Sequence, residues 1–178
     1  MREVLTLIPE YLTDTFFTYT LMSSSGKEGS QVENSKEGYA DPLFDGLLIS
    51  LLPKVQEAYG KTLAPTYSFY RVYNEGNQLD PHLDRPACQV SVTLCLGYNF
   101  DYMWPIFVSG EPYGLKPGQA IIYNGCEELH WREPLRKPPE QIDNGKPMIH
   151  SQVFLHYIEK EGPYYPEHFL DGREGGEI

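Results

Sequence analysis

Two hydrophobic periodicities divide the chain between residues 62 and 63. Before that point apolar residues recur every three or four positions, as on the buried face of a helix. After it they alternate with polar residues, as on a strand that is covered on one side. The first part of the chain, residues 1–62, therefore predicts helices, and residues 63–158 predict β-structure.

The N-terminal part predicts two helices. A short strand followed by a helix at about residues 9–18 fits the apolar positions there. A second helix begins at Asp41-Pro42, a typical N-cap and first-turn pair, and ends near Gly60. Pro53 interrupts this second helix, so we expect a kink or two shorter helices.

Two polar segments flank these elements. Residues 23–38 (SSSGKEGSQVENSKEG) contain almost no apolar side chains. This composition predicts a mobile surface loop, which is either a lid over a site or a disordered connection. Residues 159–178 are polar but include several aromatic residues, which predicts a C-terminal tail that folds back on the domain.

Short alternating segments separated by turn signals fill residues 63–158. In TYSFYRVY, Tyr67, Phe69, Arg71 and Tyr73 alternate with Ser68, Tyr70 and Val72. The other candidates are QVSVTLCLGY (89–98), WPIFV (104–108), QAIIY (119–123), LHWREPL (129–135) and SQVFLHYI (151–158). Such strands, with no helix among them, are typical of an antiparallel sandwich or barrel. We predict one α+β domain over residues 1–178: a jelly roll, or double-stranded β-helix, with the N-terminal helices packed outside.

Charge narrows the possible partners. The chain has 14 basic and 25 acidic residues, a formal net charge of −11. Binding to nucleic acid or to an anionic membrane requires clustered lysine and arginine, so we expect neither partner. In so acidic a protein, any anionic ligand needs a cation placed beside it.

Cysteine usage and the N-terminus bear on location. Cys88, Cys95 and Cys126 are odd in number and show no C-x-x-C spacing, which is typical of reduced thiols in a cytosolic protein. The N-terminus has no signal-peptide pattern, and no run reaches the roughly 18 apolar residues of a membrane span. We expect a soluble, cytoplasmic protein, and its oligomeric state stays open.

The candidate chemistry begins at LDPHLDRPACQVSVTLCLGYN, residues 79–99, where His82 and Asp84 stand two positions apart. On an extended strand such a pair points to one face, although the same pair occurs by chance at polar strand ends. His130 begins its own predicted strand 46 residues after Asp84, and a jelly roll brings distant strands side by side. Two imidazoles and one carboxylate on one face are the arrangement of non-haem Fe(II) sites that activate oxygen.

In their order along the chain, these features resemble the Fe(II)- and 2-oxoglutarate-dependent oxygenases, in particular the prolyl-4-hydroxylase-like branch. The matching segments, within residues 66–158, are YRVYNEGNQLDPHLD, QVSVTLCLGYN, WPIFV, LKPGQAIIYNGCEELHWREPL and QVFLHY. The resemblance implies that His82, Asp84 and His130 bind Fe(II) and that 2-oxoglutarate is the cosubstrate. It further implies hydroxylation of an unactivated C–H bond with release of succinate and CO2. The leading substrate candidate is then a prolyl or other peptidyl residue, ahead of a free amino acid or other small molecule.

The distal carboxylate of 2-oxoglutarate needs a cation, and here the sequence departs from the family. Its members typically place Arg or Lys on the strand after the second histidine, where this chain has Pro139, Glu140 and Gln141. Arg132, which shares the inward face of His130, is the favoured replacement because a planar guanidinium binds a carboxylate at two points.

Several assignments stay open around this cation. His150 or Lys146 are alternatives to Arg132, and the other role of Arg132 is a buried ion pair with Glu133 or Glu128. In the enzymes that the chain resembles, a tyrosine before the His-x-Asp pair hydrogen-bonds the cosubstrate. The candidates here are Tyr73 and Tyr70, and either is equally explained as an aromatic residue filling the barrel. Arg85 faces the substrate entrance or the solvent, and we interpret His156 as structural.

Two other classes of function fit the same residues. A cupin-type metal-dependent enzyme that does not use 2-oxoglutarate would keep the three ligands and need no buried cation. A non-catalytic jelly-roll binding module would have no metal. The role of Arg132 separates the first class from the oxygenase, and metal content separates the module from both enzymes.

Overall fold

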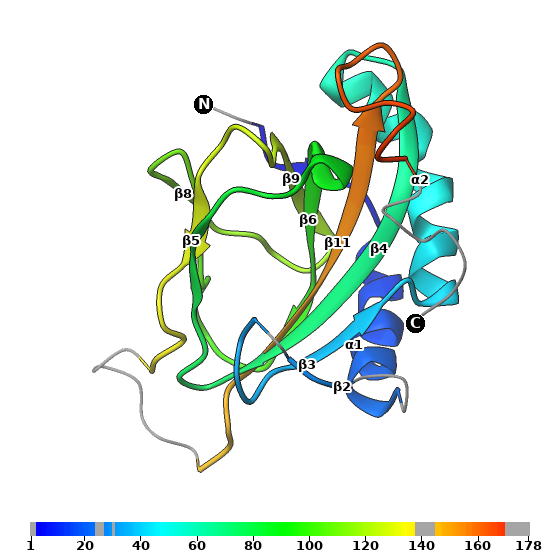
Figure 1. The fold of residues 1–178 in the computed structure, drawn as a ribbon. Coiled ribbons are helices and arrows are strands. Elements are labelled where there is room, and N and C mark those ends of the chain that lie inside the picture. The colour runs from blue at the N-terminus through cyan, green and yellow to red at the C-terminus, as the bar shows by residue number, and fades with distance from the viewer. Residues whose placement is uncertain (1–2, 24–26, 30, 138–144, 170–178) are drawn as a thin grey trace.

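The computed structural model describes residues 3–23, 27–29, 31–137 and 145–169, which form two β-sheets and two long helices (Figure 1). The larger sheet contains β1 (Leu5–Thr6), β2 (Lys27–Glu28), β3 (Lys36–Tyr39), β4 (Leu63–Asn74), β6 (Val90–Tyr98), β9 (Gln119–Asn124) and β11 (Ile149–Glu159). The smaller sheet contains β5 (Leu79–His82), β7 (Ile106–Val108), β8 (Glu111–Tyr113) and β10 (His130–Arg132). The helices are α1 (Glu10–Met22) and α2 (Pro42–Tyr59), and a short 3-10 helix spans Pro86–Cys88.

The order of the strands identifies a jelly roll. The larger sheet runs β1-β9-β6-β11-β4-β3-β2, and the smaller sheet runs β5-β10-β7-β8. From β4 to β11 the chain passes repeatedly from one sheet to the other, and all the strand pairs are antiparallel. The double-stranded β-helix predicted from the alternating pattern is therefore confirmed.

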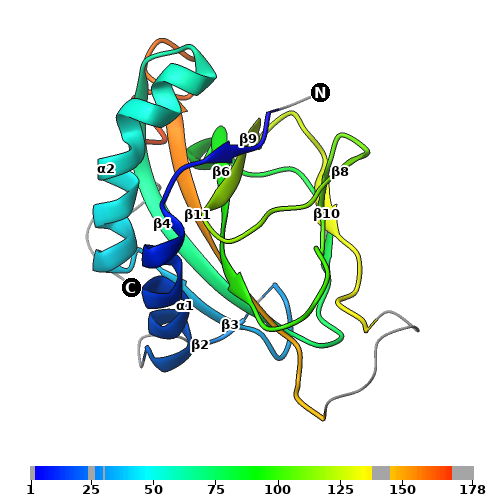
Figure 2. The ribbon, with the colours of Figure 1, turned by 180° about the vertical axis from the view of Figure 1, so that it is seen from behind.

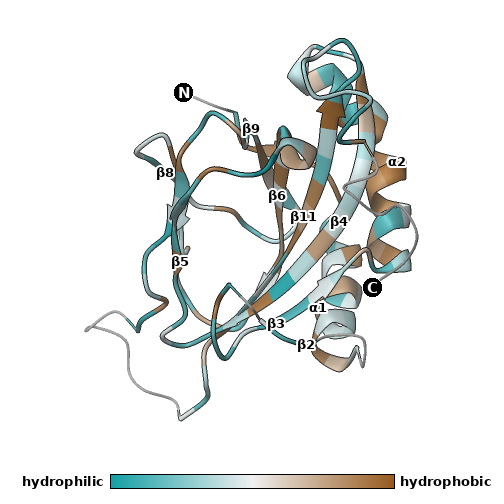
Figure 3. Cartoon of the chain, in the orientation of Figure 1, coloured by the Kyte–Doolittle hydropathy of each residue, from teal (hydrophilic) through white to brown (hydrophobic). Residues whose placement is uncertain are grey.

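Both helices lie on the outer face of the larger sheet, and the smaller sheet lies on its other side (Figures 1 and 2). The main hydrophobic core fills the layer between helices and sheet, where Phe44 and Leu48 of α2 pack with Tyr70, Val92 and Leu155. Figure 3 shows many apolar residues on α2 and at the end of β11, whereas β5 is mainly hydrophilic. The helices thus cover one sheet face, and the other face is left to line the barrel interior.

The second helix begins and ends as the sequence predicts. Asp41 caps it by accepting a 3.0 Å hydrogen bond from the Leu43 amide, and Gly60 ends it in a left-handed conformation at φ 82°. Of the two alternatives expected at Pro53, two shorter helices is wrong, because α2 continues through Pro53 as a single helix. The carbonyl that Pro53 leaves unpaired belongs to Ile49, which is 63% exposed, so water can replace the lost bond.

The prediction of a surface loop at residues 23–38 is wrong for its second half. Strand β3 pairs with β4 in this segment, and Glu37 is only 2% exposed. The acidic side chain is buried because it forms a 3.1 Å ion pair with Arg71. At Gly38 the backbone approaches β4 so closely that a Cβ would collide with the Tyr70 ring. Residues 24–26 and 30 lie outside the described residues.

The remaining differences are small. Helix α1 extends beyond residue 18 because the hydroxyl of Thr20 is buried and bonds with Ser151 at 2.7 Å, so this polar residue belongs to the core face. The short strands β5 and β8 were not predicted. Within the described part of the chain, neither helix is long and apolar enough to cross a membrane. The tail beyond residue 169 lies outside the described residues, and so do Pro139, Glu140 and Gln141.

Candidate functional site

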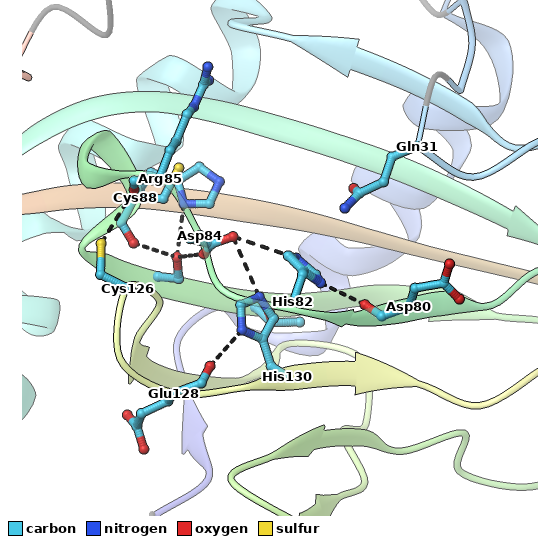
Figure 4. Close-up of polar contacts among 12 residues, drawn as sticks. Gln31, Asp80, His82, Asp84, Arg85, Cys88, Cys126, Glu128 and His130 are labelled. Carbon is cyan, nitrogen blue, oxygen red and sulfur yellow. Dashed lines mark hydrogen bonds and ion pairs between the residues drawn. The ribbon is translucent and has the colours of Figure 1, made fainter.

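Three of the predicted site residues meet at one end of the smaller sheet (Figure 4). His82 is the last residue of β5, His130 is the first of β10, and the antiparallel register places them directly opposite each other. Asp84 follows two residues after His82. Its Oδ1 lies 3.6 Å from Nε2 of His82 and 3.5 Å from Nε2 of His130. The three candidate ligand atoms all lie within 4.8 Å of one another.

The outer nitrogens of both imidazoles are held by backbone carbonyls. Nδ1 of His82 lies 2.8 Å from the carbonyl oxygen of Asp80, and Nδ1 of His130 lies 2.8 Å from that of Glu128. A carbonyl oxygen only accepts, so each Nδ1 carries the proton. Both Nε2 atoms face Oδ1 of Asp84, so these three atoms form a donor set that one metal ion could bind.

The carboxylate of Asp84 is fixed from its other side. Ser91 donates a 2.7 Å hydrogen bond from its hydroxyl to Oδ2, and the Asp84 amide donates to the Gly125 carbonyl at 2.8 Å. A Cβ at Gly125 would overlap Oδ2, so glycine is needed at this close approach. These contacts leave Oδ1 turned toward the histidines.

The electrostatics keep this carboxyl group ionised. Burial raises the pKa of Asp84, but hydrogen bonds with His130 and His82 outweigh burial and hold that pKa far below its usual range. Burial lowers the pKa of His82, and here the bond with Asp84 prevails and raises it above 6.5. The site therefore presents one negative charge between two imidazoles at neutral pH.

A cavity of about 320 Å³ opens beside these three residues. It is lined by Gln31, Tyr39, Tyr67, Phe69, Arg71, Leu79, His82, Leu83, Asp84, Arg85, Cys88, Tyr123, His130, Phe154 and His156. The side chain of His130 is 2% exposed and that of His82 is 25% exposed, so His82 stands nearer the opening. A larger cavity of about 690 Å³ between α2, β1 and β9 contains none of the three candidate ligands.

Arg132 lies two residues after His130 on β10 and is 2% exposed. It donates to the Trp104 carbonyl at 2.7 Å and to Oε1 of Gln152 at 2.6 Å, and its guanidinium stacks on the Trp104 ring at 4.5 Å. Its Nε has no hydrogen-bond partner among the described residues. Among the carboxylates that the structure describes, none pairs with Arg132, so the ion pairs considered with Glu133 or Glu128 do not form.

The alternative cations do not fit the role. Lys146 is exposed at the surface. His150 is buried, and burial together with the charge of Arg132 lowers its pKa well below 6.5, so its imidazole is neutral. It packs instead among aromatic rings, stacked on Tyr98 at 5.8 Å and edge-on to Trp104 at 5.3 Å.

The two tyrosine candidates lie on opposite faces of β4. The hydroxyl of Tyr73 is 3.4 Å from Nη1 of Arg71, and Tyr73 also interacts electrostatically with Arg132. Tyr70 points the other way and packs on Phe44 of α2 at 5.5 Å. Tyr70 was therefore wrong as a cosubstrate ligand, because strand alternation directs it into the core between helix and sheet.

Some cavity residues escaped the sequence analysis. His156, interpreted as structural, lines the cavity, and its Nδ1 lies 3.1 Å from the Ser91 hydroxyl that bonds Asp84. Arg71 also lines it and is 2% exposed. The sequence could have identified Arg71, because alternation along β4 places it on the same face as the candidate Tyr73.

A scan against protein-family models and a search of curated proteins found no match. Among solved structures, the chain is similar to a Pseudomonas putida prolyl-4-hydroxylase, with a TM-score of 0.61 and 13% identity over 86% of this chain and 91% of that one. It is also similar to the non-haem α-ketoglutarate-dependent epimerase SnoN, with a TM-score of 0.68 and 11% identity over 98% and 85%. A third is HygX from Streptomyces hygroscopicus with nickel and 2-oxoglutarate bound, with a TM-score of 0.62 and 9% identity over 86% and 81%. At these identities the likeness establishes the fold.

Proposed function

We propose that this chain is an Fe(II)- and 2-oxoglutarate-dependent oxygenase that hydroxylates an unactivated C–H bond. The proposal is carried by the position of Arg132, a buried guanidinium without a carboxylate partner among the described residues, on the same strand and face as His130. A cation buried in a barrel is costly unless an anion compensates it. The distal carboxylate of 2-oxoglutarate is such an anion.

The donor set suits Fe(II). His82 and His130 each offer an imidazole nitrogen, and Asp84 offers one carboxylate oxygen, all within 4.8 Å of one another. Two imidazoles and one carboxylate are the ligands that non-haem Fe(II) oxygenases use, and they leave positions open for other ligands. The bonds from Nδ1 to the Asp80 and Glu128 carbonyls would hold both rings in their binding orientation.

The cosubstrate would extend from these ligands toward Arg132. A guanidinium binds a carboxylate at two points, and the Trp104 carbonyl and Gln152 already fix the plane of this one. Tyr73, which interacts electrostatically with Arg132, is the predicted hydrogen-bond donor to the same carboxylate. His150, held neutral beside Arg132, adds no competing charge.

Bound Fe(II) supplies the chemistry, in which O2 and 2-oxoglutarate yield succinate, CO2 and one oxygen atom inserted into the substrate C–H bond. The protein contributes placement. Ser91 keeps Oδ2 of Asp84 away from the open side, and Tyr123, whose ring centre is 4.7 Å from that of His130, closes the cavity beside the ligand. The cavity on the side of His82 then receives the substrate.

Arg132 also argues against a cupin-type enzyme that works without 2-oxoglutarate, because that class gives the buried cation no partner. One of the similar structures is that of a prolyl-4-hydroxylase, so a prolyl or other peptidyl residue is one substrate candidate. No nucleic-acid or membrane partner is proposed. The three cysteines are free thiols, which supports the proposed cytoplasmic location.

The experiment is an anaerobic titration of metal-free protein, first with Fe(II) and then with 2-oxoglutarate, followed by calorimetry and visible absorption. We expect about one iron per chain, as one donor set implies, and its loss in His82→Ala and Asp84→Ala proteins that remain folded. We expect Arg132→Met to keep iron and to bind 2-oxoglutarate about 10–100-fold more weakly, while the exposed Arg136→Met binds both as the wild type does. Failure to bind iron, or equal binding of 2-oxoglutarate by Arg132→Met, would overturn the proposal.

A further inference from the structure

One side of the cavity is a row of aromatic rings. Tyr39 and Tyr67 have ring centres 4.7 Å apart, and Tyr67 and His156 are also 4.7 Å apart. His156 is stacked parallel to Phe154 at 6.3 Å, and Phe154 lies 5.9 Å from Phe69. These five residues of β3, β4 and β11, here called the aromatic wall, all line the cavity.

Two guanidinium groups stack on this wall. Arg71 lies 5.0 Å from the centre of the Phe69 ring, and Arg85 lies 5.1 Å from the centre of the Tyr67 ring. Arg85 also donates a 2.8 Å hydrogen bond to the Tyr67 hydroxyl. In Figure 4, Arg85 extends away from the three candidate ligands, and Gln31, from the segment before β3, lies on the side of His82. A cation is thus placed at each of two points of the wall.

The charge of the cavity differs from that of the protein. The whole chain has 25 acidic and 14 basic residues, whereas the cavity lining has two arginines and one carboxylate. That carboxylate is Asp84, which the proposed function assigns to the metal. Arg71 is buried and pairs with Glu37 at 3.1 Å, whereas Arg85 is exposed. Arg85 is therefore the cation that an incoming ligand meets.

We propose that the substrate is a small planar aromatic carboxylate, which stacks on the aromatic wall and pairs its carboxylate with Arg85. Aromatic rings attract a second π-system in offset or edge-on geometry, and a guanidinium fork binds a carboxylate at two points. The cavity volume of about 320 Å³ is at the small end of ligand pockets, which suits a single ring system. This inference rests on the proposed function, because the ring edge would face the bound iron.

The test uses three probes of similar shape: 2-naphthoate, its neutral analogue 2-naphthamide, and decalin-2-carboxylate, which keeps the charge and loses the π-system. The protein is loaded with 2-oxoglutarate and with Zn(II), which has no redox chemistry, so that binding is measured without turnover. Calorimetry should show 2-naphthoate binding at least about tenfold more tightly than either analogue. Arg85→Gln should lower the affinity for naphthoate to that for the amide, and Arg136→Gln, with the same charge change at an exposed site, should not.

Three results would overturn the inference: equal affinities for the three probes, an unchanged preference in Arg85→Gln, or tighter binding of a prolyl peptide than of naphthoate. If naphthoate is instead displaced by 2-oxoglutarate, it occupies the region of Arg132 and the inference also fails. Failure of the proposed function looks different, because Zn(II) or 2-oxoglutarate would then not bind. In that case the same probes are measured on metal-free protein, where the preference for naphthoate and its loss in Arg85→Gln decide the inference separately.

Discussion

Arg71 on β4 and Arg132 on β10 are each 2% exposed, and in the part of the chain that the structure describes the Nε of each lacks a hydrogen-bond partner. Their surroundings differ. Arg71 donates to Glu37 of β3 and to Gln31, so its charge is compensated within the protein. Arg132 donates to a carbonyl and an amide oxygen, and no described carboxylate pairs with it.

The difference separates two uses of a buried cation. In the region of Arg71, an ion pair ties a polar strand, β3, to the barrel. Arg132 lies on β10, two residues after the candidate metal ligand His130. Among the described residues, no carboxylate pairs with its positive charge. Because burying an unpaired charge is costly, we attribute its presence to an anionic ligand.

The largest effect should come from Glu37→Ala, which leaves the Arg71 charge buried and unpaired. We expect the free energy of unfolding to fall by about 3–5 kcal/mol, as for other broken buried pairs. Urea denaturation measures this loss, and Glu57→Ala, at an exposed position of α2, is the control. A loss no larger than that of the control would mean that Arg71 does not depend on Glu37.

Arg132→Met should affect the binding of 2-oxoglutarate more than the free energy of unfolding. The free energy of unfolding should change less than in Glu37→Ala, because the variant removes a buried charge instead of leaving one unpaired. The dissociation constant of 2-oxoglutarate should rise by about 10–100-fold, the value of a charge-assisted hydrogen bond. In a thermal melt, 2-oxoglutarate should stabilise the wild type and Arg136→Met but not Arg132→Met. Equal stabilisation of all three would remove the distinction between the two arginines.

Acid should weaken metal binding by His82, Asp84 and His130. Hydrogen bonding with Asp84 outweighs the effect of burial and raises the pKa of His82 above 6.5, so protons compete for its Nε2 as the pH falls through that pKa. Below it, Zn(II) affinity should fall by about tenfold per pH unit for each imidazole that titrates. Calorimetric titrations at a series of pH values measure the slope. An affinity that does not change with pH would exclude imidazole ligands.

The smallest effect should come from Tyr73→Phe, which removes a hydroxyl that lies 3.4 Å from Nη1 of Arg71 and interacts electrostatically with Arg132. We expect 2-oxoglutarate binding to weaken by about three- to tenfold, the value of one ordinary hydrogen bond. Tyr70→Phe is the matched control, because that hydroxyl lies on the opposite face of β4 and none of the described residues forms a hydrogen bond with it. If both variants behave alike, Tyr73 does not contact the cosubstrate.

The sequence was most informative where local pattern decides structure. Alternation located β4, β6 and β11 to within a few residues, and Asp41 and Gly60 marked the ends of α2. The resemblance brought together His82, Asp84 and His130, which the structure places within 4.8 Å. That these residues bind iron stays a prediction.

What the sequence missed depends on contacts between distant residues. Strand β3 is polar, and Glu37 becomes a buried residue only through Arg71, which lies 34 positions away. The failure of Lys146 and His150 as cations follows from exposure and from the neighbouring charge of Arg132, which no local pattern reveals. Tyr70 is a different case, because alternation along β4 already predicts that Tyr70 and Tyr73 point to opposite faces of the strand.

The most direct test of the oxygenase proposal is succinate release. Protein loaded anaerobically with Fe(II) and 2-oxoglutarate is exposed to O2, and succinate and consumed oxygen are quantified without any added substrate. We expect equal amounts of both, dependent on Fe(II), from the wild type and Arg136→Met, and neither from Asp84→Ala. Protein that has bound iron and 2-oxoglutarate but forms no more succinate than Asp84→Ala would contradict the proposal.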